Sequence, residues 1–257
     1  MSSQFSGAFA KVRRAAEQMT NLKTVIDNHV DTNVPVIVIE PDPVTGDKIA
    51  KLKLQRPIPD TINLAAGEII YHLRSALDHT AIAVARLSQV ANEKTIYFPT
   101  GPSLTEFERE IGKKLRGVAP HLVDAIKETK PYGGGNEALR AVFEMANVDK
   151  HIELIPIIAN QVTMLVSNLI IHGTLMLNSH PFQSLDEGIP FANLGKTGSI
   201  SARNTKSKLT ITVHVCFGQS ACLGRPIIPT IDAMIINVGQ AIDLICDRAG
   251  SIHGNLP

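Results

Sequence analysis

Residues 61–88 read TINLAAGEIIYHLRSALDHTAIAVARLS, and their apolar side chains recur every three or four positions. That spacing places side chains on one face of an α-helix. Asp60 or Thr61 supplies a polar residue suited to cap the first turn. The stretch therefore predicts a long central helix whose apolar face is buried. The members of that face are Ile62, Ala66, Ile69, Ile70, Leu73, Ala76, Leu77 and Val84.

Further helical patterns flank this helix, and a strand-rich region follows them. Two β-branched or alternating runs, at 34–39 and 48–54, enclose the turn-forming sequence DPVTGD and predict a β-hairpin. From 160 to 225, runs such as KLTITVHVCFG alternate with Asn, Gly and Ser, which predicts an antiparallel sheet of four or five strands. The other predicted helices cover about 5–30, 103–115, 120–129, 137–155 and 229–248.

The order of these elements predicts an α+β fold in a single domain over 1–257. We expect a helical half over about 1–158 that carries the β-hairpin at 34–54. A sheet half over about 160–225 and a C-terminal helix over about 229–248 complete the prediction.

Composition excludes several classes of protein. With 44% apolar and 19% charged residues, the 257-residue chain is globular rather than disordered. A formal net charge of +1 gives no global field that attracts nucleic acid, and 4% aromatic residues disfavour a base-stacking platform. Three cysteines indicate free thiols in a reducing compartment. The first twenty residues lack a secretory signal, and we find no uninterrupted apolar span, so we expect a cytoplasmic protein with no membrane partner.

The central helix carries a row of polar side chains beside its apolar face. Since an α-helix advances about 100° per residue, His72, Ser75, His79 and Arg86 all lie within about 40° of Glu68. This row is a solvent-exposed face, a buried structural network or a functional site. Histidine favours the last of these, because it titrates near neutral pH and can move protons or bind metal ions.

Two more polar rows have comparable geometry. Arg74 and Asp78 lie four residues apart on another side of the central helix, which predicts an intrahelical ion pair. On the helix over 137–155, a row repeats the spacing of the first one: Arg140, Glu144, Asn147 and His151. If this row and the Glu68 row face each other, they form a polar seam that is either a structural network or a ligand site. Glu68, His72, Ser75, Asp78, Glu144, Asn147 and Asp149 are the candidate binding residues.

The stretch GEIIYHLRSALDH at 67–79 resembles a group of bacterial and phage proteins of unassigned function, whose helix reads G-E-x-x-x-N-L-R-S-A-L-D-H. Later matches in order are YFPT at 97–100, KPY at 130–132 and NVDKH at 147–151, so the resemblance covers about 60–158. His72 stands where the group has Asn, and Ile152 where it has Arg. The resemblance implies no activity.

Arg74-x4-His79 is also similar to the R-x(4–6)-H motif of HEPN domains, which are helical bundles and include metal-independent endoribonucleases that act as dimers. This likeness implies that Arg74 binds the scissile phosphate, and that His79 acts as general base or acid, in a homodimer that cleaves RNA. Ser75 stands where HEPN motifs place a more polar residue. His151 is a further candidate catalytic residue.

A metal site is the remaining enzymatic alternative. Histidine and carboxylate side chains on the two helices would have to converge, although the two histidines of the central helix lie about 10 Å apart along its axis. The side chains concerned are His72, His79, Asp149 and His151, with Glu68 or Glu144 as ligand or base. We predict no cofactor. Three functions stay open. Our leading hypothesis is an RNA- or protein-binding protein, and the alternatives are a HEPN-like ribonuclease and a metal-dependent hydrolase.

Overall fold

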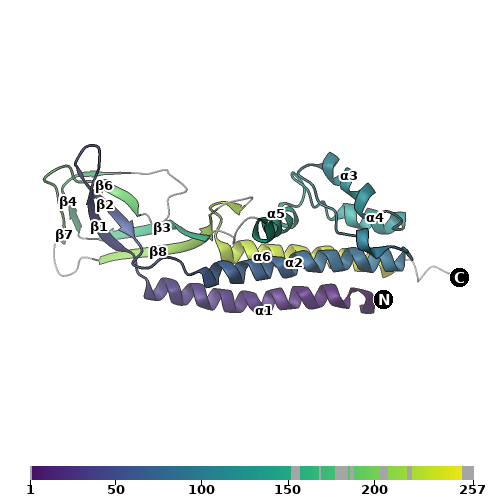
Figure 1. The fold of residues 1–257 in the computed structure, drawn as a ribbon. Helices are drawn as coiled ribbons and strands as arrows, with labels where there is room; N and C mark the ends of the chain where they lie inside the picture. Colours follow the sequence, from purple (N-terminus) through teal and green to yellow (C-terminus); the bar gives the residue numbers. More distant parts are fainter. Residues whose placement is uncertain are drawn as a thin grey trace. The chain divides into compact units, whose positions relative to one another are not determined.

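The computed structural model describes residues 2–151, 157–167, 169–176, 185, 188–202, 208–218 and 222–250 (Figure 1). It has the α+β architecture predicted from the sequence, with long helices, an antiparallel sheet and a C-terminal helix. The chain divides into two compact units, one formed by 1–23, 63–155 and 228–257, and the other by 24–62 and 156–227. The single domain over 1–257 stays a prediction.

The first unit is helical. Long helices α1, α2 and α6 lie in one bundle, and the shorter helices follow α2 along the chain (Figure 1). The described helix ends agree with the sequence pattern to within a few residues, and the predicted end of the 137–155 helix lies outside the described residues. Ser103 caps α3, because its side chain accepts a hydrogen bond from the Glu106 N–H. The helices are α1 Ser2–Thr32, α2 Asp60–Leu87, α3 Leu104–Lys114, α4 Pro120–Glu128, α5 Glu137–His151 and α6 Ile227–Gly250, with a short 3₁₀ helix, η1, at Glu93–Thr95.

Helix α2 is the centre of this unit. All eight residues of its predicted apolar face are completely buried. Burying such a face against neighbouring helices is what stabilises a helix of this length in water. The prediction of a core helix from 61–88 is therefore confirmed.

Helix α1 packs antiparallel to α2 in a regular register. The Gln18 side chain donates a hydrogen bond of 2.9 Å to Glu68, and the backbone of Gly7 lies against the imidazole of His79. Eleven residues separate the contacts on each helix, as two straight antiparallel helices require.

The second unit contains a four-stranded antiparallel sheet in the order β1–β2–β6–β5. Its strands are β1 Val36–Pro41, β2 Lys48–Lys53, β6 Ile189–Asn193 and β5 Thr174–Leu175. The hairpin that we expected in the helical half thus supplies two strands of this sheet. Its turn includes Gly46 at φ +70°, and the Asp42 carboxylate accepts hydrogen bonds from the backbone of Val44 and Thr45.

The remaining described strands form two antiparallel pairs. Strand β3 (Ile157–Ser167) pairs with β8 (Lys208–Phe217), and β4 (Leu169–Ile171) pairs with β7 (Ile200–Ala202). The longest β-branched runs of the sequence therefore pair with each other and not with the four-stranded sheet. The three cysteines, all described, form no disulfide.

Helix α6 is long and apolar enough to cross a membrane by length and composition alone. In the bundle it buries one stripe, which includes Ile231, Val238 and Ile245, while Asp232 and Asp243 on other sides are exposed. The core helix of a soluble protein has this same pattern, so the apolar character of α6 is weak evidence for a membrane span.

Candidate functional site

Whether the polar row of α2 meets the Arg140 row of α5 was open from the sequence. In the structure Glu68 and His79, near the two ends of that row, contact α1 instead. Glu68 accepts the hydrogen bond from Gln18, and His79 lies on Gly7, where an added Cβ would be 3.0 Å from the imidazole Nδ1. The α1 residues Gly7, Lys11, Arg14 and Gln18 repeat the 4-3-4 spacing of Glu68, His72, Ser75 and His79. Matching spacing on antiparallel helices allows successive pairs to meet, which explains the seam between α1 and α2.

His72 lies inside this α1–α2 seam. Its Nδ1 is buried and has no hydrogen-bond partner among the described residues. Burial lowers the pKa of His72, the positive charges of Lys11 and Arg14 lower it further, and Glu68 opposes them. His72 is therefore held toward its neutral form, which suits a structural position better than a proton-transfer site at neutral pH.

The second polar row of α2 faces α5 and the segment after η1. Arg74 and Asp78 form the predicted ion pair, with 3.0 Å between Nε and Oδ2. The other carboxylate oxygen of Asp78 accepts a 2.9 Å hydrogen bond from the backbone N–H of Phe98. The guanidinium carbon of Arg74 lies 3.9 Å from the ring centre of Phe143 on α5, a cation–π contact. Asp78 thus contacts one edge of the Arg74 guanidinium, and Phe143 contacts its face.

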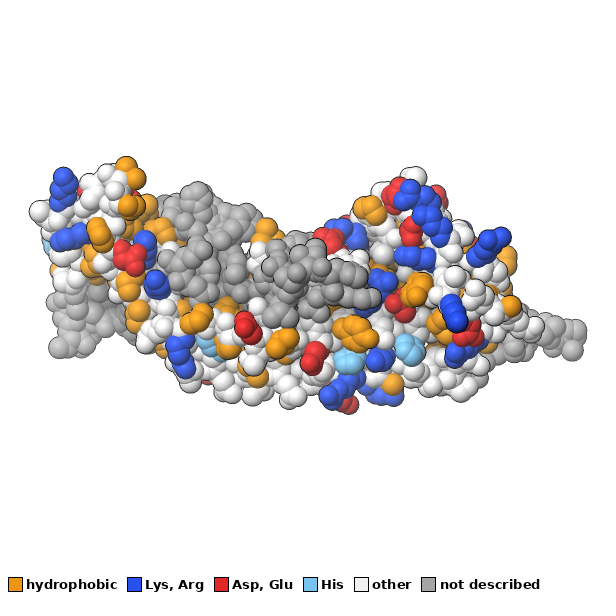
Figure 2. Space-filling view, in the orientation of Figure 1, with side chains coloured by type: hydrophobic (Ala, Val, Ile, Leu, Met, Phe, Trp, Pro, Cys, Tyr) orange, Lys and Arg blue, Asp and Glu red, His pale blue; other side chains and the backbone are white. Residues whose placement is uncertain are grey.

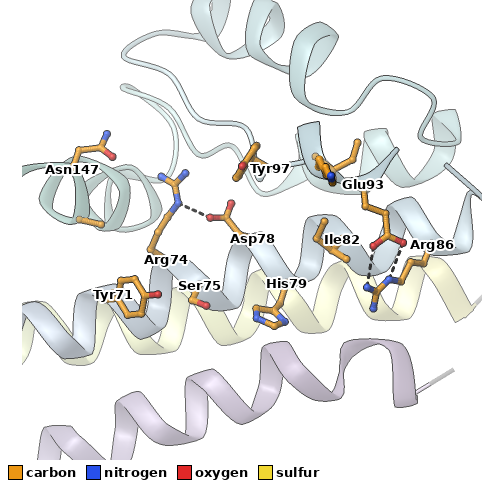
Figure 3. Close-up of a pocket in the computed structure, with 13 residues that line it drawn as sticks. Tyr71, Arg74, Ser75, Asp78, His79, Ile82, Arg86, Glu93, Tyr97 and Asn147 are labelled. Carbon is orange, nitrogen blue, oxygen red and sulfur yellow. Dashed lines mark hydrogen bonds and ion pairs between the residues drawn. The ribbon is translucent and has the colours of Figure 1, made fainter. Parts of the chain in front are cut away.

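An open pocket of about 600 Å³ lies over this row (Figure 3). One wall comes from α2, and the other from the segment around η1 and from α5. Figure 3 shows the guanidinium of Arg74 projecting from α2 between Asn147 on one side and Tyr97 on the other. His79, on the opposite flank of α2, points toward α1 and lines the same pocket.

Arg74 retains hydrogen-bonding capacity that a ligand can use. Among the described residues, its hydrogen bonding runs through Nε to Asp78. Its two Nη groups, which carry four of the five guanidinium N–H bonds, make no hydrogen bond to the described part of the chain. A guanidinium held at one edge and along one face presents its outer edge in a geometry that matches a carboxylate or phosphate.

The far end of the pocket carries another ion pair. Arg86 at the end of α2 binds Glu93 through two hydrogen bonds of 2.9 Å each. This pairing raises the pKa of Arg86 and lowers that of Glu93, in both cases mainly through the side-chain hydrogen bond. Lys94 beside them is exposed, and its ammonium group has no partner among the described residues. The end of the pocket is thus cationic but partly neutralised.

Half of the ten predicted site residues line this pocket: Arg74, Ser75, Asp78, His79 and Asn147. The other five separate into three groups. Glu68 and His72 belong to the α1–α2 seam, and Glu144 pairs with Arg140 at 2.7 Å. Asp149 and His151 belong to the last turn of α5, but their side chains lie outside the described residues. Among the described residues, no group of histidine, cysteine and carboxylate side chains is arranged to hold a metal ion.

Sequence reasoning missed the aromatic part of the site. Tyr71 and Tyr97 line the pocket and are 59% and 47% exposed. The Tyr71 ring also contacts the ring of His72 and the ammonium group of Lys11. Tyr71 precedes Arg74 by three residues, so helical spacing already places them side by side. The position of Tyr97 depends on the Asp78–Phe98 hydrogen bond, which no local pattern predicts.

No protein-family model matches this chain, and no curated protein or solved structure matches it either. The likeness to the bacterial and phage group and the likeness to HEPN domains therefore stay predictions.

Proposed function

We propose that this chain is a binding protein whose pocket holds an anionic group of its ligand against Arg74. The observation that carries this proposal is the immobilised guanidinium, which stacks on Phe143, pairs through Nε with Asp78 and turns both Nη groups to the pocket. An arginine fixed in this way loses little rotamer entropy when an anion binds, so more of the interaction energy appears as affinity.

The neighbouring side chains complete such a site. Asn147, Ser75 and the hydroxyl groups of Tyr71 and Tyr97 provide hydrogen-bond donors and acceptors around Arg74. Ile82 and Ile96 contribute an apolar surface to the same pocket. A few polar groups that converge on an otherwise apolar wall are typical of ligand pockets.

Titration with sodium acetate and with inorganic phosphate tests the proposal, followed by the ¹⁵N signals of the arginine side chains and of the Asn147 side-chain amide, which lines the same pocket. Both Arg74 and Asn147 should shift in a saturable way in the wild type, and Arg74→Gln should abolish the shift of Asn147. Arg74→Lys should weaken binding, because an ammonium group lacks the bidentate geometry. Arg13 on α1 is exposed and lies outside the pocket, so Arg13→Gln is the matched control. Equal anion binding by the wild type and Arg74→Gln would overturn the proposal.

A second candidate function is a metal-independent ribonuclease that uses Arg74 and His79. The observation in its favour is that both side chains line one pocket although they lie five residues apart on α2. In this function Arg74 stabilises the phosphate, and the exposed imidazole of His79 transfers the proton.

Incubation of the pure protein with total RNA and EDTA tests this second function. Wild-type protein should cleave the RNA, and His79→Ala should not. Absence of cleavage by the wild type, or equal cleavage by His79→Ala, excludes the ribonuclease and leaves the anion-binding proposal standing.

A further inference from the structure

The pocket is elongated. Its α2 wall runs from Tyr71 to Arg86, which corresponds to about 22 Å of helix. The pocket volume of about 600 Å³ is spread along that length, so the site is a groove rather than a compact cavity. An extended polypeptide of about six residues spans this length.

The chemistry of the groove changes along its length. Near one end Arg74 supplies N–H donors, and near the other Lys94 supplies an ammonium group, that make no hydrogen bond within the part of the chain that the structure describes. Between them the wall includes Ile82, Ile96 and Tyr97. A matching ligand carries a carboxylate toward Arg74, apolar side chains next to it, and a second acidic group toward Lys94.

The charge balance disfavours a nucleic-acid strand. The groove contains three cationic side chains, Arg74, Arg86 and Lys94, but also the carboxylates of Asp78 and Glu93. Both carboxylates would repel a polyanion, and the guanidinium of Arg86 is already paired with Glu93. Figure 2 shows Lys and Arg side chains interspersed with Asp and Glu over the visible face, in keeping with the net charge of +1. Binding of a phosphodiester chain depends on a continuous excess of positive charge, which is lacking on this face.

We infer that the groove along α2 binds an extended acidic and apolar peptide segment, about six residues long, of a partner protein. This inference rests on the proposed anion-binding function and names its ligand class. A glutamate or aspartate of the segment binds the Nη groups of Arg74. Its apolar side chains lie on Ile82 and Ile96, and its backbone N–H groups find acceptors in Asn147, Ser75 and the tyrosine hydroxyls.

Fluorescence polarisation with degenerate, fluorescein-labelled hexapeptide libraries tests the inference on the full chain. One library has glutamate at the first position, aspartate at the sixth, and Leu, Ile or Val at the four between them. The second has glutamine in place of that glutamate, and the third is the glutamate library shortened to its first three residues. An oligouridylate hexamer is the nucleic-acid probe.

We expect the glutamate hexamers to bind at least about tenfold more tightly than the glutamine hexamers, since a charge-assisted bidentate contact is lost in the latter. They should also bind more tightly than the trimers. Arg74→Gln should remove the preference for glutamate, and Lys94→Gln should weaken binding about threefold as a change of a rim charge. Lys23→Gln, an exposed lysine of α1 outside the groove, is the control and should bind like the wild type.

Three results would overturn the inference. They are equal binding of the glutamate and glutamine libraries, equal binding of trimers and hexamers, and tighter Arg74-dependent binding of the oligouridylate. If no peptide library binds but acetate still shifts the Arg74 signal, the peptide inference fails and the proposed function survives. If acetate and phosphate also leave Arg74 unaffected, the proposed function fails as well.

Discussion

Asp78 holds the candidate site together, so Asp78→Ala should cost a substantial part of the protein's stability. Its carboxylate accepts one hydrogen bond from Arg74 at 3.0 Å and one from the Phe98 N–H at 2.9 Å. Its side chain is 27% exposed, and that of Arg74 is 20% exposed, so solvent screens the pair only in part. Phe98 is fully buried, and its amide would lose its acceptor.

The magnitude follows from these two contacts. A hydrogen bond to an ionised group contributes about 1.5–3 kcal/mol, and an i,i+4 ion pair adds about 0.5 kcal/mol. We therefore expect Asp78→Ala to lower the free energy of unfolding by about 2–3 kcal/mol. Asp78→Asn keeps an oxygen for the Phe98 N–H and loses only the charge, so it should cost about 1 kcal/mol.

Urea denaturation followed by circular dichroism measures both variants, and hydrogen exchange at the Phe98 amide reports the local effect if the two units unfold separately. Asp124→Ala is the control, because Asp124 is 66% exposed and pairs with Lys127 at 3.4 Å on the surface of α4. It should change stability little. The reasoning is refuted if Asp78→Ala unfolds within 0.5 kcal/mol (roughly the spread of a surface substitution) of the wild type, or if Asn is as costly as Ala.

Three further predictions concern the surroundings of the site. Gly7→Ala should stabilise α1 by up to about 1 kcal/mol, because alanine has a higher helix propensity than glycine. The added methyl group should displace the exposed His79 ring, and a changed NMR shift of the His79 Cε1–H would reveal this. An unchanged shift would contradict the contact between Gly7 and His79. Because the pKa of His72 is lowered in the folded state, the unfolded state binds its proton first, so stability should fall as the pH drops below about 6.5. The urea midpoint should fall between pH 7.5 and pH 5.5 in the wild type, and it should fall less in His72→Gln. The same fall in both proteins would exclude a contribution of His72 to the pH dependence of stability. Phe143→Leu should lower the free energy of unfolding by about 1–2 kcal/mol and increase the motion of the Arg74 guanidinium. ¹⁵N relaxation of the guanidinium measures this motion. An unchanged order parameter would argue against a cation–π contact that restrains Arg74.

Local periodicity was sufficient to predict the helices. The start of α3 follows from its Ser103 cap, and that of α4 from Pro120 in its first turn, both of which are local properties of the sequence. The ion pair between Arg74 and Asp78 was predictable for the same reason, since four residues separate them on one helix. The α+β class also followed from the order of the elements.

The pairing of the strands could not be predicted from local sequence. The hairpin of β1 and β2 was recognisable from its turn, but its pairing with β6 joins residues about 140 positions apart along the chain. Period-2 alternation of apolar residues predicts a strand but does not indicate which other strand pairs with it. The tertiary structure was therefore needed to show which strands form the four-stranded sheet.

The candidate site shows the same division between local and tertiary information. Three helices carry rows of mostly polar residues with one spacing. They lie at positions 7, 11, 14 and 18 (the first of these is Gly7), at 68, 72, 75 and 79, and at 140, 144, 147 and 151. The sequence by itself determines that each row lies on one side of its helix, because helical geometry depends on the chain's own backbone. It cannot determine which rows meet, because that depends on how the apolar faces of α1, α2 and α5 pack together. The tertiary structure pairs the Glu68 row with α1, and it thereby turns Arg74, and not His72, toward the pocket beside α5.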